Sequence, residues 1–322
     1  MSPAAADQSR HAHLGDRAFA VVVTLLGGSV LFIVGVIVLV CTRLSLPAFA
    51  KIGFFHFLGG SDWNPVEDSF GALPFVYGTL VTSAIAIVLA MPVAIGLALF
   101  LTEMSPAKVR RFVSFFVEIL AAIPSVVFGL WGLLVLVPIL RDVVEPALGR
   151  WLGWIPLFSG APLGIGFLPA GIVLAILILP TIASVTIEVL RTMPSALREG
   201  ALALGATRWE AIRAVVLPYA SRGIMGAVIL GLARALGETM AVTMVIGNSS
   251  RAITGSLLTP GYTMASAIAN QFNEADKPIY FSALVEVALV LLLVSAAVNV
   301  VARLLIWQMQ GGRRAHLGVV VV

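Results

Sequence analysis

Six long apolar runs restrict what this chain can fold into. They cover residues 18–40, 75–101, 112–140, 169–189, 220–246 and 280–307. Each is longer than the roughly 20 residues that an α-helix needs to cross the hydrocarbon core of a bilayer. Charged residues make up only 11% of the chain, against about 25% in soluble domains. Because a segment in lipid must satisfy its own backbone hydrogen bonds, the sequence predicts an all-α integral membrane protein with six transmembrane helices.

Basic residues are unequally divided between the two sets of connecting segments. The N-terminal tail, the loops 103–111 and 191–222 and the segment from Arg303 to the C-terminus together hold 13 basic and 5 acidic residues. The alternate loops, 43–68, 141–151 and 251–277, together hold 6 basic and 7 acidic residues. Since cytoplasmic segments are enriched in Lys and Arg, both termini are predicted to be cytoplasmic.

This orientation divides the chain into a cytoplasmic N-terminal tail (1–17), a transmembrane domain (18–308) and a cytoplasmic C-terminal tail (309–322). The net charge of +4 reflects the basic bias at the inner face of the membrane. The sequence contains no compact basic domain, so we predict no binding of nucleic acid.

Several kinds of chemical site are excluded by the residue types available. Cys41 is the only cysteine, so an internal disulfide, a Cys-based zinc site and a Cys-pair redox motif are impossible. The four histidines are divided between the two tails and one loop, which disfavours a metal site. The three lysines follow Ala50, Ala107 and Asp276, and none therefore ends a phosphate-binding P-loop. We predict no metal, no cofactor and no ATPase site in this chain.

The loop after the fourth apolar run has a distinctive sequence pattern, EGALALGATRWEAIRAVVLP from Glu199 to Pro218. Thr207 and Glu210 form a capping box, which predicts a short helix that starts just after Gly205 and is stopped by Pro218. Another short helix is predicted over 196–204. Two short helices joined at a glycine form a protruding knob that needs a socket on a partner. The alternative is an ordinary loop whose apolar residues lie on the membrane surface.

This pattern resembles the cytoplasmic coupling loop of bacterial ABC importer permeases. The matching positions are Glu199, Gly200, Ala201, Gly205, Val215, Leu217 and Pro218. The resemblance implies that the loop 191–218 contacts a separate ATPase, which binds the ATP and Mg²⁺. The residues expected at that contact are Glu199, Gly200, Ala201, Leu202, Gly205, Ala206 and Thr207. Gly200 stands where the pattern most often has alanine, so the first short helix is expected to be looser than usual.

Five ionisable residues fall within or near the apolar runs, where each is expensive and by default functional. They are Glu118, Glu188, Arg234, Glu238 and Glu286. Glu188 and Glu286 lie close to predicted helix ends, which favours solvated, interfacial carboxylates. Glu118 lies about two turns inside its run and precedes Pro124 and Ser125; structural hydrogen bonding and a pathway role both stay open for it.

Arg234 lies near the middle of the fifth run, and Glu238 follows four residues later, on the same predicted helical face. The same run carries a ridge of small residues that lets another helix approach closely. The ridge consists of Gly223, Ala227, Gly231 and Ala235. The two charges are thus expected beside a helix contact. Arg suits an anion pathway because its planar fork matches phosphate oxygens; the alternative is a buried structural ion pair.

Five further blocks resemble the C-type permease subunits of the bacterial phosphate-specific transport (Pst) ABC importers. They read SDWNP at 61–65, FGAL at 70–73, YGTLVTS at 77–83, EILAAIPS at 118–125 and GLARALGETMAV at 231–242. The resemblance implies a type I ABC importer permease fold in the bacterial cytoplasmic membrane. It places Arg234 and Glu238 in the phosphate pathway, and we add Glu118, Ser125 and Thr82 from the matching blocks.

The resemblance also implies partners and a mechanism. The expected partners are a paired A-type permease, two ATP-binding subunits and an extracytoplasmic phosphate-binding protein. ATP binding would move the knob and switch the two permeases between outward and inward access to phosphate. Trp63, Trp151 and Trp154, in loops on the opposite side, are expected either at a docking rim for the binding protein or in an interfacial aromatic belt.

Two alternatives stay open. An ABC permease for another oxyanion, such as sulfate or molybdate, would carry the same coupling loop. A secondary transporter without an ATPase would favour broken helices, and Pro92, Pro124 and Pro180 do interrupt apolar runs. However, neither half of the sequence repeats the other, and a loop with the pattern of 199–218 has no role in a secondary transporter.

Overall fold

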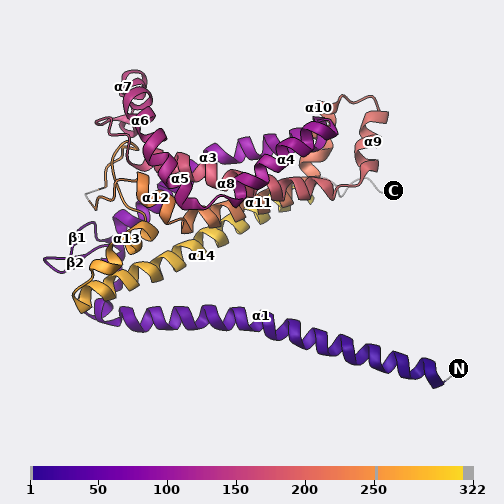
Figure 1. Ribbon diagram of the computed structural model, residues 1–322, viewed down its shortest axis with the longest axis horizontal. Coiled ribbons are helices and arrows are strands. Elements are labelled where there is room, and N and C mark those ends of the chain that lie inside the picture. Colours follow the sequence, from indigo (N-terminus) through magenta and orange to yellow (C-terminus); the bar gives the residue numbers. More distant parts are fainter. Residues whose placement is uncertain (1–2, 251–252, 315–322) are drawn as a thin grey trace.

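The computed structural model describes residues 3–250 and 253–314, and helices dominate it (Figure 1). Within these residues, six helices are long and apolar enough to cross a membrane. They are Phe19–Ile52, Leu73–Met104, Ser125–Leu152, Phe167–Arg191, Arg208–Gly237 and Pro278–Leu304. The predicted all-α architecture with six membrane-spanning helices is therefore confirmed, while the cytoplasmic placement of the termini stays a prediction.

The first and last helices are longer than the apolar runs indicate. Helix α1 begins at Pro3 and ends at Ile52, and helix α14 runs from Pro278 to Arg314. The two helices meet where α1 ends and α14 begins, and they diverge towards the two chain termini (Figure 1). The valine run at 319–322, for which the sequence suggests no function, lies outside the described residues.

A small aromatic core closes the end of the molecule where α1 gives way to α2 (Phe54–Gly59). Strands β1 (Trp63–Asn64) and β2 (Ser69–Phe70) pair antiparallel, with Trp63 opposite Phe70. The Trp63 ring is buried against Phe70 and Phe75, and its Nε1 donates to Gln271 Oε1 at 2.7 Å. The expectation that Trp63 belongs to an exposed rim or belt is therefore wrong, because its indole is consumed by packing and by a buried hydrogen bond.

Trp151 and Trp154 behave differently. Both are 81% exposed, at the end of helix α7 (Glu145–Leu152) and in the turn after it. Helix α7 projects from the body of the molecule beside the loops at this end (Figure 1). These two indoles remain available for an interface or for the membrane boundary.

A charge cluster ties the hairpin to its surroundings. Lys51 Nζ lies 3.0 Å from Asp68 Oδ2, and Lys277 Nζ lies 3.1 Å from Asp68 Oδ1. Lys277 also donates to the carbonyl of Pro65 at 3.0 Å. The hydrogen bond from Lys51, and then that from Lys277, lowers the pKa of the Asp68 carboxyl below its ordinary value.

This cluster gives a pH prediction for stability. Because the pKa of Asp68 is lower in the folded chain, its stabilising contribution is complete above the ordinary value of 3.8 and is lost as the pH falls through the folded value. We expect Asp68→Asn to lower the melting temperature at neutral pH and to leave it unchanged once the pH is acidic enough to protonate Asp68. Melting in detergent against pH measures this. The control is Asp62→Asn, at an exposed residue; a pH-independent difference for Asp68→Asn would contradict the prediction.

Three helices pack tightly at the centre of the fold: α3 (Leu73–Leu99), α8 (Phe167–Arg191) and α11 (Leu217–Gly237). The predicted small-residue ridge of α11 is confirmed, and its partner is α8. A Cβ atom at Gly223 would collide with the Val189 side chain, and one at Gly231 would come within 2.6 Å of Ile182 Cγ1. Helix α3 contributes its own buried ladder of small residues, Ala86, Ala90, Ala94 and Ala98.

The predicted third span is interrupted. Helix α4 (Ala107–Ala122) stops at Ile123 and Pro124, which are extended with ψ of 129° and 140°. The chain becomes helical again at Ser125 with α5 (Ser125–Trp131). The proline ring explains the break, because it disfavours helical backbone at the residue before it. The membrane-spanning helix is therefore Ser125–Leu152 rather than 112–140.

Other prolines are absorbed without a break. After α5 the helix continues through η2 (Gly132–Leu136), α6 (Val137–Ile139), η3 (Leu140–Val144) and α7. Likewise α10 (Arg208–Ala211) continues through η5 (Ile212–Val216) into α11. The wide π-type turns η2, η3 and η5 each end two residues before a proline: Pro138, Pro146 and Pro218. A wider turn makes room for the proline ring, so the prediction that Pro218 stops the second coupling helix is wrong.

Candidate functional site: a translocation face and a coupling knob

Arg234 and Glu238 do not share one helical face. Helix α11 ends at Gly237, and Glu238 is extended with φ of −70° and ψ of 126°. In the part of the chain that the structure describes, no ion pair within 4.0 Å joins the two side chains. The predicted i, i+4 geometry is therefore wrong, because the helix ends before the fourth residue is reached.

Each of the two residues instead joins two helices. The guanidinium of Arg234 donates from Nη1 to Thr181 Oγ1 on α8, at 3.1 Å. The carboxylate of Glu238 accepts the N–H of Ala241 at 3.3 Å, in the first turn of α12 (Met240–Val245). Arg234 is exposed in this subunit, so it keeps N–H donors available for another group.

The break at Glu238 lies next to the break at Pro124. Helices α5 and α12 each begin just after an interruption, and they pack against one another. Their approach is close, because a Cβ atom at Gly129 would lie 2.9 Å from Ala241 Cα. Non-helical backbone at membrane depth is tolerated only where it is buried in protein or lines a polar cavity. Because α5 and α12 pack together near their first residues, Ser125, which begins α5, lies in the same region as Glu238.

Glu118 faces a hollow between α4 and α8. Two cavities, of about 450 and 250 Å³, share Ser114, Glu118 and Arg191 in their linings. Glu118 is exposed there, and it is separated from Ser125 by the break at Pro124. The structure thus places Glu118 on an open face of the subunit.

Helix α8 carries a polar stripe that sequence reasoning missed. Its members are Thr181, Ser184, Glu188 and Arg191, with successive spacings of three, four and three residues. This spacing places all four on one face of the helix. The stripe begins at the Arg234 contact and ends at Arg191, whose Nη1 lies 2.7 Å from Glu188 Oε1. The periodicity of polar residues within the apolar run 169–189 would have revealed it.

Two sequence-derived candidates lie elsewhere. Thr82 is buried within α3, and its hydroxyl donates to the carbonyl of Gly78, one turn earlier in the same helix, at 2.8 Å. Glu286 is fully buried on α14, and neither of its carboxyl oxygens has a hydrogen-bond partner among the described residues. The expectation of an interfacial, solvated Glu286 is wrong, because α14 begins at Pro278 and continues past this residue into the packed interior.

The predicted knob is present. Helix α9 (Ser195–Ala203) is followed by Gly205, which has a φ of +88°, and by the capping box of Thr207 and Glu210. The N–H of Thr207 donates to Glu210 Oε2 at 2.8 Å, while Thr207 Oγ1 accepts from the N–H of Glu210 at 3.3 Å. Leu204 is 91% exposed at the tip. A rigid, capped corner with an exposed apolar tip is suited to insertion into a partner.

Comparison with known proteins agrees with these features. Residues 90–307 match the model of the family described as binding-protein-dependent transport system inner membrane component. A relative from Pasteurella multocida, named phosphate transport system permease protein PstC, is 48% identical over 270 residues, which is 83% of either chain. The protein of the same name from Mesorhizobium japonicum is 46% identical and covers 90% of this chain and 88% of its own.

Solved structures support the fold. The crystal structure of a bacterial ABC transporter involved in the import of alginate contains a chain that aligns with a TM-score of 0.55 at 20% identity, covering 81% of this chain and 87% of that one. The six spanning helices are those of an ABC importer permease embedded in the inner membrane. The chain belongs to the family of binding-protein-dependent transport system inner membrane components and, within it, to the PstC permease proteins.

Proposed function

We propose that this permease conducts inorganic phosphate across the cytoplasmic membrane, along the face marked by Arg234. One observation carries the proposal: a guanidinium near the end of a membrane-spanning helix, which donates to neutral Thr181 and is exposed beside two helix breaks. An arginine in hydrocarbon is costly unless paired or hydrated. Phosphate oxygens satisfy its remaining donors with the right planar geometry. The names of the PstC relatives support phosphate as the cargo.

Glu238 favours phosphate over sulfate. At neutral pH phosphate still carries a proton on one or two oxygens, whereas sulfate carries none. One carboxylate oxygen of Glu238 accepts the N–H of Ala241, which leaves the other to accept a hydrogen bond from a protonated oxyanion. Sulfate would instead face that oxygen with charge repulsion, so a carboxylate beside Arg234 discriminates between the two anions.

The remaining parts of the machine lie on other chains in this proposal. A paired A-type permease covers the open face that carries the α8 stripe, and an extracytoplasmic binding protein delivers phosphate. Two ATP-binding subunits receive the α9 knob and bind ATP and Mg²⁺, since the sequence of this chain has no P-loop. Polar groups line the proposed path on either side of Arg234, and they belong to Ser125, Glu118 and the α8 stripe. ATP-driven closure of the partner subunits then alternates access to this face.

Stimulation of ATP hydrolysis tests the cargo. In nanodiscs that contain the assembled complex, we expect phosphate-loaded binding protein to raise the hydrolysis rate, and sulfate-soaked or empty binding protein to raise it little. Phosphate uptake into proteoliposomes provides the parallel measurement. Equal stimulation in the presence of sulfate would support a general oxyanion permease instead, and failure of the chain to assemble with any ATPase would remove the proposal.

A further inference from the structure

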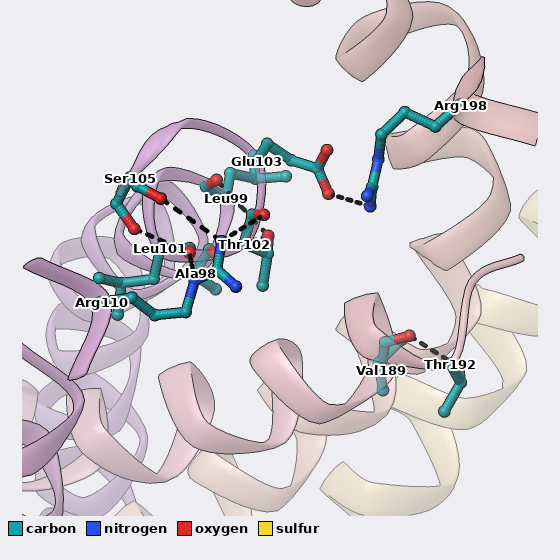
Figure 2. Close-up of polar contacts among 10 residues, drawn as sticks. All are labelled: Ala98, Leu99, Leu101, Thr102, Glu103, Ser105, Arg110, Val189, Thr192 and Arg198. Atoms are coloured by element: carbon teal, nitrogen blue, oxygen red, sulfur yellow. Dashed lines mark hydrogen bonds and ion pairs between the residues drawn. The ribbon is translucent and has the colours of Figure 1, made fainter. Parts of the chain in front are cut away.

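We infer that Glu103 and Arg198 form a latch that transmits motion of the coupling knob into the transmembrane core. The inference rests on the proposed ATP-driven function. Arg198, on α9, donates from Nη2 to Glu103 Oε1 at 2.6 Å, across 95 residues of sequence (Figure 2). The Glu103 side chain is 5% exposed, and that of Arg198 is 34% exposed. Because the Glu103 carboxylate is nearly buried, loss of its charged partner costs more than it would at a surface pair.

The knob has few other ties to the body. Helix α9, all of whose residues the structure describes, contains no buried residue. Among the described residues, Arg198 is the α9 side chain that makes a hydrogen bond or ion pair to another helix. Pro194 precedes α9, and Gly205, with its positive φ, follows it. Helix α9 also touches α10 and η5, so Arg198 is its polar tie to the end of α3. Displacement of α9 therefore reaches α3 chiefly through the Arg198 guanidinium.

The receiving end of the latch is stiff. Glu103 lies in η1 (Phe100–Met104), the wide turn that ends α3. Arg110 of α4 donates to three backbone carbonyls there: from Nε to that of Leu101 at 2.7 Å, and from Nη2 to those of Thr102 and Ser105 at 3.4 Å each (Figure 2). A cationic side chain on the last carbonyls of a helix is a favourable cap. A pull on Glu103 therefore moves the C-terminal end of α3 and the N-terminal end of α4 as one unit.

The latch also has room to change. A cavity of about 180 Å³ adjoins the pair, lined by Glu103, Arg198, Leu202, Arg208, Ala211 and Ile212. Arg198 Nε is buried and has no partner among the described residues. The guanidinium can therefore grip Glu103 in two ways, through Nη2 alone or through Nε and Nη2 together. The link survives a shift of α9 because the fork can rotate in the cavity.

The latch connects the knob to the face marked by Arg234. Helix α3 packs along α8, and α8 carries Thr181, the partner of Arg234. A displacement that begins at α9 thus reaches the Arg234 level through α3 and α8. Glu103 and Arg198 are positioning residues, since neither lies at the Arg234 contact nor at the tip of the knob.

Charge exchange in the reconstituted complex tests the latch. We expect Glu103→Arg or Arg198→Glu to lower phosphate import by about tenfold or more, because each leaves like charges facing one another in a partly buried site. The double variant that carries both changes should recover most of the import. The phosphate imported per ATP hydrolysed should fall in the single variants and recover in the double one, which a purely structural defect would not produce. Glu103→Gln keeps the side-chain shape, so its assembly with the partner subunits serves as the control for misfolding.

The matched control is Lys108→Glu, a charge reversal at an exposed residue of α4, which should import phosphate normally. Spin labels at Lys108→Cys and Ser195→Cys, in a Cys41→Ser background, give a readout that needs no substrate. We expect a narrow distance distribution with and without ATP in the otherwise unaltered chain, a broad one with Arg198→Glu, and a narrow one again in the charge exchange. If Arg198→Glu leaves the distribution narrow, or the exchange leaves it broad, the latch is refuted. If only phosphate stimulation fails, the proposed cargo is refuted and the latch stands.

Discussion

Arg234→Ala is expected to lower phosphate uptake by about a hundredfold or more, with the complex still assembled. The magnitude follows because the change removes charge-assisted hydrogen bonds that are worth about 1.5–3 kcal/mol each in a site shielded from water. Assembly should survive, since Arg234 makes one side-chain hydrogen bond among the described residues, to Thr181, while small-residue packing holds α11 against α8. Radiolabelled phosphate uptake, with a pull-down of the partner subunits, measures both quantities.

Three companion variants sharpen this test. Arg222→Ala removes an exposed arginine from the same helix and should import phosphate normally. Arg234→Lys keeps the charge but loses the planar fork, so it should recover only part of the uptake. Glu238→Gln should narrow the preference for phosphate over sulfate, because an amide donates a hydrogen bond to either anion. Uptake at the unaltered rate in both Arg234→Ala and Glu238→Ala would remove this region from the pathway.

Gly205→Val is expected to abolish coupled transport while the docking of the binding protein survives. Gly205 has a φ of +88°, and no atom lies within 4 Å of the position that a Cβ would occupy. The substitution therefore acts through backbone strain alone, which is of order 1–3 kcal/mol for a β-branched residue in this region. Relief of that strain would unwind the corner between α9 and the Thr207 capping box. Phosphate-stimulated ATP hydrolysis in nanodiscs and binding-protein pull-down measure the two halves of the prediction.

Gly205→Asn supplies the matched control for the backbone argument. Asparagine is larger than alanine yet tolerates a positive φ better than other non-glycine residues. We therefore expect Gly205→Asn to retain much of the coupled transport that Gly205→Val loses. If the valine variant imports phosphate with normally coupled hydrolysis, the knob is not the element that transmits force. If both variants fail equally, side-chain volume at the partner's socket is responsible, rather than strain.

Features with a local physical cause could be predicted from the sequence. The six apolar runs determined membrane insertion and helix number, because each run alone decides whether it satisfies the bilayer. The capping box at Thr207 and the turn at Gly205 were visible for the same reason, since their hydrogen bonds and dihedrals involve only neighbouring residues. The small ridge from Gly223 to Ala235 was readable as a periodic face, although its partner was not.

Features that depend on how helices meet were decided only by the tertiary structure. Pro124 breaks its helix while Pro218 does not, although both stand in apolar surroundings, because a π-type turn absorbs only the second. Helix α11 ends at Gly237, so Arg234 and Glu238 bind α8 and α12 rather than one another.

The sequence therefore indicates which residues belong to the candidate site, but not which contacts they make. Length, periodicity and capping act within a few turns of helix, so the sequence sufficed for the six membrane-spanning helices, the corner at Gly205 and the two charged residues Arg234 and Glu238. The burial of Trp63 and Glu286 became visible only in the packed fold. The tertiary structure alone showed that Thr181 receives Arg234 and that Glu103 receives Arg198. Each of these contacts joins residues more than 50 positions apart, and their meeting depends on helix packing that no local pattern encodes.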